Sequence, residues 1–236
     1  MNIKISNGMN FLDTILSVIF PVYCISCGKE GLDLCINCLL DSPPAERESA
    51  NWIFPLFDYR HIPIKKSIWL LKYKGKRRLA GTFAEIMYGK IIEELSDLHT
   101  IQNFNDAILI PIPLSKKRYR ERGYNQAELI CRELIKLDLN INLRYSVDVK
   151  IERNFKFESN ILIKTKETEH QANIKDRKDR LKNLADSFSV KNGELIKGKN
   201  IILIDDVTTT GATLTEAKKI LKQFGAKKII AFTVAH

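Results

Sequence analysis

The sequence predicts an α/β fold in which helices cover a twisted, mainly parallel β-sheet. Three observations predict it. Residues 200–234 follow the order strand, loop, helix, strand, which is typical of a parallel βαβ unit. The apolar run 107–111 is typical of a buried parallel strand and precedes a helical pattern. The chain has 236 residues, 44% of them apolar, which is enough for one such core and a small appendage.

An N-terminal module is predicted from four clustered cysteines, which form two CxxC pairs. Each CxxC turn directs two thiolates toward one point, and the short spacer brings both pairs around one ion. Four thiolates close the coordination shell, which favours structural zinc over catalytic zinc, and a redox CxxC would stand as a single pair. The predicted zinc ligands are Cys24, Cys27, Cys35 and Cys38.

The stretch before these cysteines raises the question of a signal peptide. Its apolar positions over 11–20 fit one face of a short docking helix. A lipoprotein signal is disfavoured because Asp13 interrupts the stretch and because Pro21 and Tyr23 lie where a cleavage site needs small residues. We therefore expect a cytoplasmic protein with no membrane span.

The remaining elements follow from turn signals and hydrophobic periodicity. A turn-rich stretch over 41–50 predicts a boundary between the module, 1–49, and a main domain, 50–236. Residues 151–199 are polar and basic, and we expect a long mobile loop or hairpin there rather than core. The other expected elements are strands over 52–59, 107–111, 201–204 and 229–234, and helices around 64–71, 79–95, 127–134 and 214–224.

Two of these helices carry specific expectations. Cys131 falls on the inward face of the helix around 127–134 and is expected to be a core residue rather than a nucleophile. In the last helix, Leu214, Ala217, Leu221 and Phe224 are expected to face inward, with Gly225 as the stop signal.

An acidic pair ends the strand over 201–204, and a loop rich in threonine follows it. Asp205 and Asp206 are suited to accept hydrogen bonds from ribose hydroxyls, and one of them can also reach a Mg²⁺ ion or its water shell. The loop 208–213 leads into a helix N-terminus, where backbone amides and hydroxyls suit a phosphate. Helix capping is the simpler alternative, but it accounts for one aspartate and not for two.

A run of cations follows the strand 107–111 and therefore leaves the sheet at the same edge. Such cations can neutralise a pyrophosphate. Because Tyr119 and Tyr124 lie among them, the run also fits contact with single-stranded DNA, while a solvated loop is the simplest alternative. The cations concerned are Lys116, Lys117, Arg118, Arg120 and Arg122.

The acidic pair with its loop resembles the motif with which type I phosphoribosyltransferases bind 5-phosphoribosyl 1-pyrophosphate (PRPP). The resemblance implies that fold, a Mg²⁺-dependent PRPP site, and contacts of both aspartates with the ribose. It also implies that a run of seven residues surrounds the 5-phosphate, namely Val207, Thr208, Thr209, Thr210, Gly211, Ala212 and Thr213.

Two further patterns resemble the ComF (competence protein F) family, whose members also carry a four-cysteine zinc module. One is the sequence RGYNQ over 122–126, and the other is the set Lys164, Gln171, Arg177, Asn183 and Phe188. This resemblance implies a role in handling imported single-stranded DNA during natural transformation. It also implies PRPP, single-stranded DNA and other competence or DNA-processing proteins as partners.

The function remains open between three alternatives at this point. The net charge of +10 suits phosphate-rich partners, although a lysine-rich proteome also produces it. One alternative is a DNA-handling factor, and the second is a phosphoribosyltransferase acting on an unidentified nitrogen acceptor. The third is a PRPP sensor without turnover. No residue stands out as a general base.

Overall fold

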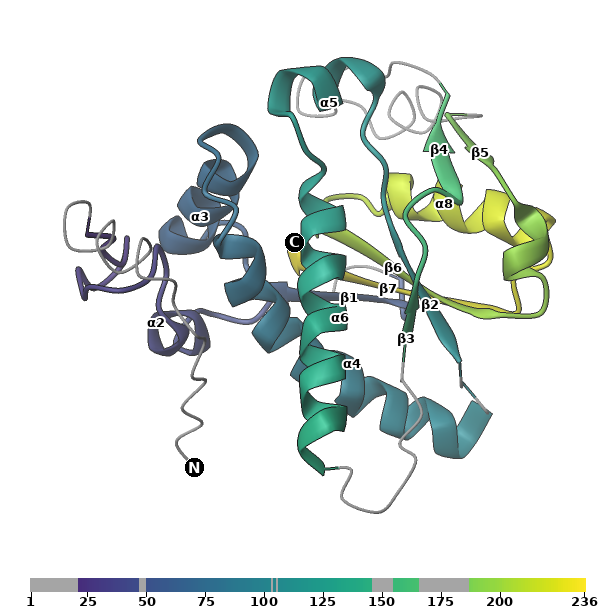
Figure 1. Ribbon diagram of the computed structural model, residues 1–236, viewed down its shortest axis with the longest axis horizontal. Coiled ribbons are helices and arrows are strands. Elements are labelled where there is room, and N and C mark those ends of the chain that lie inside the picture. Colours follow the sequence, from purple (N-terminus) through teal and green to yellow (C-terminus); the bar gives the residue numbers. More distant parts are fainter. Residues whose placement is uncertain (1–20, 47–49, 103, 105, 146–154, 166–186) are drawn as a thin grey trace.

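The structure is a computed structural model that describes residues 21–46, 50–102, 104, 106–145, 155–165 and 187–236. Its centre is a five-stranded parallel sheet of order β1-β7-β6-β2-β3 (Figure 1). Two further strands form a separate antiparallel sheet. The central strands are β1 (Ile53–Phe57), β2 (Ala107–Pro111), β3 (Phe155–Phe157), β6 (Asn200–Val207) and β7 (Lys228–Ala235), and the pair consists of β4 (Leu162–Lys164) and β5 (Phe188–Val190).

Helices cover both faces of the central sheet (Figure 1). Side chains alternate between the faces along each strand, and both faces are buried, which explains the continuous apolar runs. In β6, Ile202 and Ile204 face the core of α4 and α6, whereas Ile201 and Leu203 face α8. The helices are α2 (Ile36–Leu40), α3 (Ile62–Tyr73), α4 (Leu79–Gln102), α5 (Lys116–Arg122), α6 (Gln126–Tyr145) and α8 (Ala212–Gln223), with a 3₁₀ turn, η2 (Gly193–Ile196).

The predicted α/β class with a parallel sheet is confirmed, and β2 has the predicted bounds. The region 151–199 differs from expectation. It supplies β3 to the central sheet, where Phe155 is buried beside β2, and only β4 and β5 form the expected hairpin. Phe224 also differs, since it lies at the end of α8 with 45% of its surface exposed rather than inside.

The cysteine segment joins the main domain through the strand β1. The Pro43 carbonyl accepts a hydrogen bond from the Asp58 amide, and the Ala45 amide donates to the Leu56 carbonyl. Cys24, Leu34 and Leu39 belong to the same buried cluster as α3 and α4. The division into 1–49 and 50–236 stays a prediction.

In the portion of the chain that the structure describes, no helix is both long enough and apolar enough to cross a bilayer. The helix predicted over 11–20 lies outside the described residues, as do Gln171, Arg177 and Asn183.

Candidate functional site

A cleft of about 330 Å³ opens at the carboxyl edge of the central sheet. In open α/β sheets this edge is where ligands bind, because the loops and helix N-termini that follow the strands converge there. The lining combines carboxylates, cations, hydroxyls and aromatic rings, contributed by the ends of β2 and β6, by the segment after β1, and by α3, α5, α6, α8 and β4. Its polar and aromatic members are Tyr59, Trp69, Lys72, Tyr73, Arg118, Arg122, Gln126, Lys164, Asp205, Asp206, Thr209 and Thr213.

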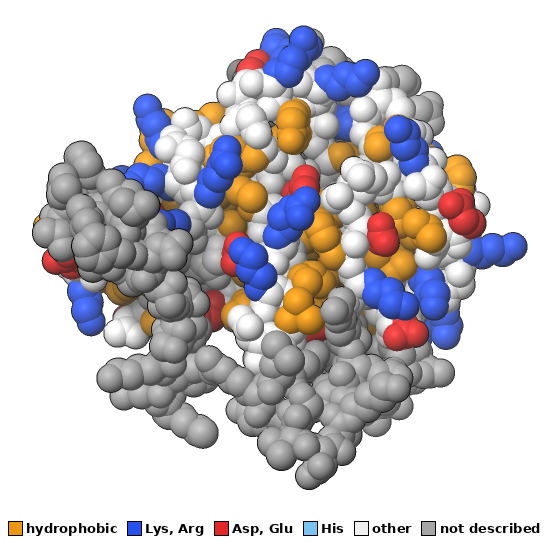
Figure 2. All heavy atoms as spheres, viewed as in Figure 1, with side chains coloured by type: hydrophobic (Ala, Val, Ile, Leu, Met, Phe, Trp, Pro, Cys, Tyr) orange, Lys and Arg blue, Asp and Glu red, His pale blue; other side chains and the backbone are white. Residues whose placement is uncertain are grey.

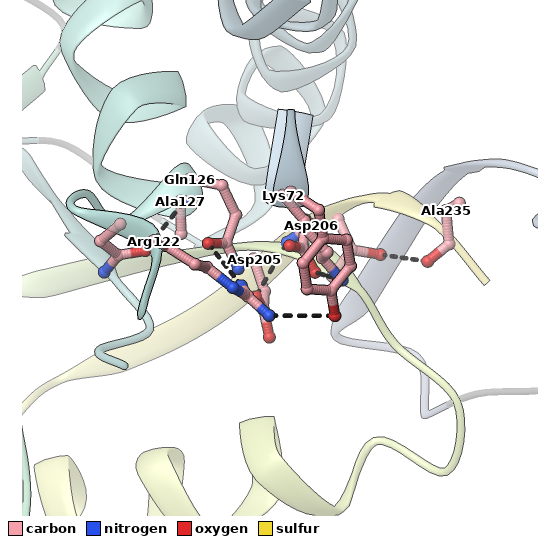
Figure 3. Close-up of polar contacts among 10 residues, drawn as sticks. Lys72, Arg122, Gln126, Ala127, Asp205, Asp206 and Ala235 are labelled. Atoms are coloured by element: carbon pink, nitrogen blue, oxygen red, sulfur yellow. Dashed lines mark hydrogen bonds and ion pairs between the residues drawn. The ribbon is translucent and has the colours of Figure 1, made fainter. Parts of the chain in front are cut away.

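The strand β6 continues through the acidic pair, so the two carboxylates point to opposite sides of the sheet. Asp206 points toward α3, where its Oδ1 atom lies 2.8 Å from Lys72 Nζ (Figure 3). Its Oδ2 atom is buried without a hydrogen-bond partner among the described residues. Asp205 is half-buried, and its Oδ1 atom accepts the Asp206 amide at 2.8 Å.

Lys72 is held in its charged form at this site. Burial acts to lower its pKa, but the carboxylates of Asp206 and Asp205 outweigh that effect and raise the pKa above the ordinary value. A buried ammonium therefore neutralises part of the acidic pair.

Asp205 titrates in the physiological range. Burial is the main cause and the neighbouring Asp206 carboxylate adds to it, and together they raise the pKa of Asp205 from 3.8 to about 7. Between these two values the folded chain holds a proton that the unfolded chain has lost. The contribution of Asp205 to stability therefore falls as the pH rises from about 4 to about 7.

A pH dependence of ligand binding follows from the same shift. A ribose hydroxyl donates to the ionised carboxylate, so binding below a pH of about 7 must release the Asp205 proton. We expect the affinity for a ribose phosphate to fall by up to about tenfold for each pH unit below that value. Calorimetry across this range measures it, and Asp205→Asn is the control, because it removes the Asp205 titration and keeps that of the ligand's own phosphates. Equal pH profiles for the two proteins would contradict the prediction.

The loop after β6 forms a small hollow in front of α8. Gly211 begins the helix with φ of +70°, a left-handed conformation that favours glycine, and Ile53 Cδ1 would lie 3.0 Å from an added Cβ atom. The Thr208 amide donates to the Ala235 carbonyl, which ties the loop to β7. The hollow is lined by Asp205, Val207, Thr208, Thr209, Gly211, Ala212, Thr213 and Leu214. Thr210 is not among them, and its hydroxyl accepts the Ala212 amide at 3.4 Å.

The cation-rich segment is the helix α5 and not a loop. Ser115 caps its start by accepting the Arg118 amide, and Gly123, with φ of 74°, ends it. The helical conformation directs only some of the predicted cations toward the cleft. Arg118 and Arg122 line the cleft, whereas Lys116, Lys117 and Arg120 do not contribute to it in the described structure.

Arg122 is fixed in place by neighbours on two other helices. It donates to Gln126 Oε1 at 2.9 Å (Figure 3) and to the Tyr73 hydroxyl at 3.3 Å. Its guanidinium also lies 5.0 Å from the centre of the Tyr73 ring. This positions a permanent positive charge at the cleft wall.

The wall formed by α3 was not predicted from the sequence. Trp69, Lys72 and Tyr73 have the spacing i, i+3, i+4, which places them on one face of the helix. That spacing predicts that the three side chains share a face of the helix, but it does not predict that this face borders a ligand cleft. Trp69 and Tyr73 remain 46% and 50% exposed there.

The four cysteines come together as predicted, and their geometry fits zinc. Their Sγ atoms all lie within 4.8 Å of one another, and the Cys27 and Cys35 sulfurs are 3.8 Å apart. A tetrahedral ion with Zn–S bonds of about 2.3 Å requires sulfurs about 3.8 Å apart. Burial acts to raise the pKa of Cys24, but backbone amides of Cys27, Cys35 and Ser26 outweigh it and lower the pKa to about 6. Cys131 is fully buried in the core, as predicted, which raises its pKa.

Comparison with known proteins identifies the family. Competence protein F of Haemophilus influenzae is 31% identical over 224 residues, covering 92% of this chain and 85% of that protein. The chain belongs to the ComF family. Another similar protein, competence protein ComFC of Bacillus subtilis, is 32% identical over 72% of this chain and 59% of its own length. The DNA utilization protein YhgH of Escherichia coli O6:H1 is 25% identical over 83% of this chain and 74% of its own length.

A family model described as the phosphoribosyl transferase domain matches residues 150–236 of this ComF protein. The match contains the acidic pair, the threonine-rich loop and α8. With the parallel sheet, it confirms the predicted fold of the type I phosphoribosyltransferase kind with an N-terminal cysteine cluster.

Proposed function

We propose that this ComF protein binds PRPP in the cleft at the carboxyl edge of the sheet and acts in the handling of imported single-stranded DNA during natural transformation. One observation carries the PRPP part of the proposal. The cleft brings together an acidic pair, a hydroxyl-lined helix N-terminus and two arginines, which matches the ribose, the 5-phosphate and the pyrophosphate of one ligand.

Each part of the ligand has a partner of suitable chemistry. Asp205 and Asp206 accept from the ribose hydroxyls, and the loop 207–213 surrounds the 5-phosphate with amides and hydroxyls at the positive end of α8. Arg118 and Arg122 neutralise the pyrophosphate, for which a planar guanidinium offers paired donors.

The metals of this proposal differ in role. Mg²⁺ enters with PRPP, and the carboxylate oxygens of the acidic pair are the hard ligands it prefers. When bound, it offsets charge on the pyrophosphate. Zinc is held by the four cysteines as a structural ion, and the reducing conditions of the cytoplasm suit thiolate ligands.

The DNA part of the proposal is supported by the relatives' names and by α5. Two relatives are named for competence and one for DNA utilization. Lys and Arg side chains gather at the top of Figure 2, where Figure 1 places α5, and Tyr119 on that helix is 50% exposed. Cations with an exposed ring suit the phosphates and bases of a single strand. We therefore assign Lys116, Lys117 and Arg120 to DNA contact.

The division of α5 gives a testable contrast between two arginines. Arg122→Ala is expected to lower the affinity for PRPP by about 10-fold or more, because it removes charge-assisted hydrogen bonds inside the cleft. Arg120→Ala is expected to change PRPP affinity by less than about twofold and to weaken binding of single-stranded DNA, with a flatter salt dependence. Calorimetry with PRPP and fluorescence anisotropy with a labelled oligonucleotide measure both effects. Equal losses of PRPP affinity in the two variants would contradict the assignment.

A second candidate function is phosphoribosyl transfer, because Asp205, Arg118 and Arg122 line one cleft and would hold a ribose beside its leaving group. A nitrogen nucleophile would attack C1 of the ribose while the bond from C1 to the pyrophosphate oxygen breaks. The pyrophosphate leaves with its electron pair, and the nitrogen loses a proton to solvent. Positioning and electrostatics would supply the catalysis. Acceptor-dependent release of pyrophosphate tests it, and binding without release under all acceptors tried argues for the binding role.

A further inference from the structure

We propose that the cysteine module holds the α3 wall of the cleft in position through the ion pair between Asp33 and Lys76, so that metal binding by the module and PRPP binding by the cleft are thermodynamically coupled. Asp33 and Lys76 are then positioning residues for a site that neither of them lines. The inference rests on the proposed function of the cleft.

On the module side, Asp33 is part of the structure that gathers the four thiols. Its carbonyl accepts the Ile25 amide at 2.9 Å. This hydrogen bond joins the first CxxC turn to the residues just before the second CxxC pair. Two residues later, the Cys35 amide donates to Cys24 Sγ at 3.4 Å. The Asp33 side chain is only 7% exposed, so its carboxylate occupies a defined position.

On the cleft side, Lys76 follows the left-handed turn at Gly75 and is hydrogen-bonded to the last turn of α3. Its amide donates to the Leu70 carbonyl at 3.4 Å. Its Nζ atom lies 3.0 Å from Asp33 Oδ1. Lys72 lies four residues before Lys76, in the last turn of α3. Its Nζ atom contacts Asp206 in the cleft. Two lysines from one short segment therefore connect two acids, one in the module and one in the proposed ligand site.

Packing reinforces this connection. Leu34 follows Asp33 directly and is fully buried in the same cluster as Ile68 and Leu71 of α3 (Figure 1 shows the module beside this helix). The Leu71 carbonyl accepts the hydroxyl of Tyr124, which follows α5. A displacement of the cysteine segment would thus act on α3 through both a charge pair and the core.

An ion pair on a protein surface is usually worth little, which is the simplest alternative for Asp33 and Lys76. Here the carboxylate is buried, so removal of the lysine leaves it without its counter-charge. The expected effect is therefore larger than that of an exposed pair. Lys90 and Glu93 on α4 form such an exposed pair and provide the comparison.

Coupling between two sites is reciprocal: if metal binding raises the affinity for PRPP by some factor, PRPP raises the affinity for metal by the same factor. Typical couplings are about 5-fold to 150-fold. Equilibrium competition for zinc between the full-length chain and a zinc-selective chelator, with and without PRPP and Mg²⁺, reads out the coupling independently of any enzymatic activity. We expect PRPP to raise the zinc affinity of the wild-type chain by about fivefold or more.

The decisive variants are Asp33→Asn and Lys76→Met. Each is expected to retain one zinc per chain and to lose about fivefold or more in PRPP affinity, and PRPP should no longer raise the zinc affinity. Exchange of the two charges, Asp33→Lys with Lys76→Asp, should restore part of the coupling, which a purely local packing defect would not allow. Glu93→Gln should leave both readouts unchanged. In Asp205→Asn, at a PRPP concentration that leaves its cleft empty, any remaining effect of PRPP on zinc affinity reports direct contact between ligand and ion.

The outcomes separate the two proposals. A wild-type chain that binds PRPP but has the same zinc affinity with and without it overturns the coupling alone. Zinc-loaded Asp33→Asn and Lys76→Met chains with wild-type PRPP affinity do the same. A folded wild-type chain that does not bind PRPP overturns the proposed function and the coupling together.

Discussion

Replacement of Asp206 by asparagine is expected to lower the free energy of unfolding by about 3–5 kcal/mol. Its carboxylate is the counter-charge of Lys72, whose side chain is 18% exposed, and the two groups meet at 2.8 Å. Asparagine has nearly the same shape but no charge, so the mostly buried ammonium loses its paired carboxylate and keeps only the more distant Asp205 as counter-charge. Urea unfolding of the zinc-loaded protein measures the loss.

Two further variants decide whether the buried charge is the cause. Adding Lys72→Met to Asp206→Asn should recover most of the stability, because the double variant buries neither charge. Asp58→Asn, which removes an acid paired with the exposed Arg60, should cost far less, because solvent screens that pair. A cost for Asp206→Asn as small as that of Asp58→Asn would show that Lys72 and Asp206 are not paired in solution.

Loss of one zinc ligand is expected to be at least as severe. Cys35→Ser should abolish zinc binding and lower the melting temperature by about 10 °C or more, since a loss of about 3–5 kcal/mol corresponds to such a shift in a chain of this size. The reason is that Cys24, Leu34 and Leu39 are buried in the main core, so the metal-bound segment covers apolar surface of α3 and α4.

Elemental analysis for zinc and calorimetric melting test this prediction together. Cys131→Ala is the matched control, because that thiol is buried in α6 away from the cluster and its loss should leave one zinc per chain. A Cys35→Ser chain that melts like the wild type would mean that the cysteine segment does not stabilise the main domain.

The sequence predicted the parts of the site that are contiguous in the chain. The strand end, acidic pair, loop and helix over 200–223 form one local unit, so residue types and order were sufficient. The cysteine cluster was predictable for the same reason, since the spacing of the ligands largely determines where the thiols can meet.

Contributions that depend on tertiary arrangement were missed. Lys72 lies on an amphipathic helix, and only the packing of α3 beside β6 brings it to Asp206. The strand β3 spans three residues in a polar region, too short for a periodic signal, although Phe155 is fully buried. Phe224 fits the inward spacing of α8, yet it lies where the helix ends and packs beside Gly193.

The cations of α5 also show that the sequence alone did not predict which side chains face the cleft. Their number predicted an anion-binding segment, but the helix that Ser115 and Gly123 delimit decides which of them face the cleft. Arg118 and Arg122 are four residues apart and therefore share a face.

The most direct test of the PRPP site is a calorimetric titration of PRPP with Mg²⁺ into the folded, zinc-loaded chain and into its Asp205→Asn variant. Asp205 is the suitable position because it lines the cleft and is not the ion-pair partner of Lys72, so its replacement leaves that pair intact. The account predicts binding by the wild-type chain and a loss of about 10-fold or more in affinity for the variant. A wild-type chain that is folded and zinc-loaded but gives no binding heat at any pH between about 6 and 8, with displacement assays equally negative, would contradict it.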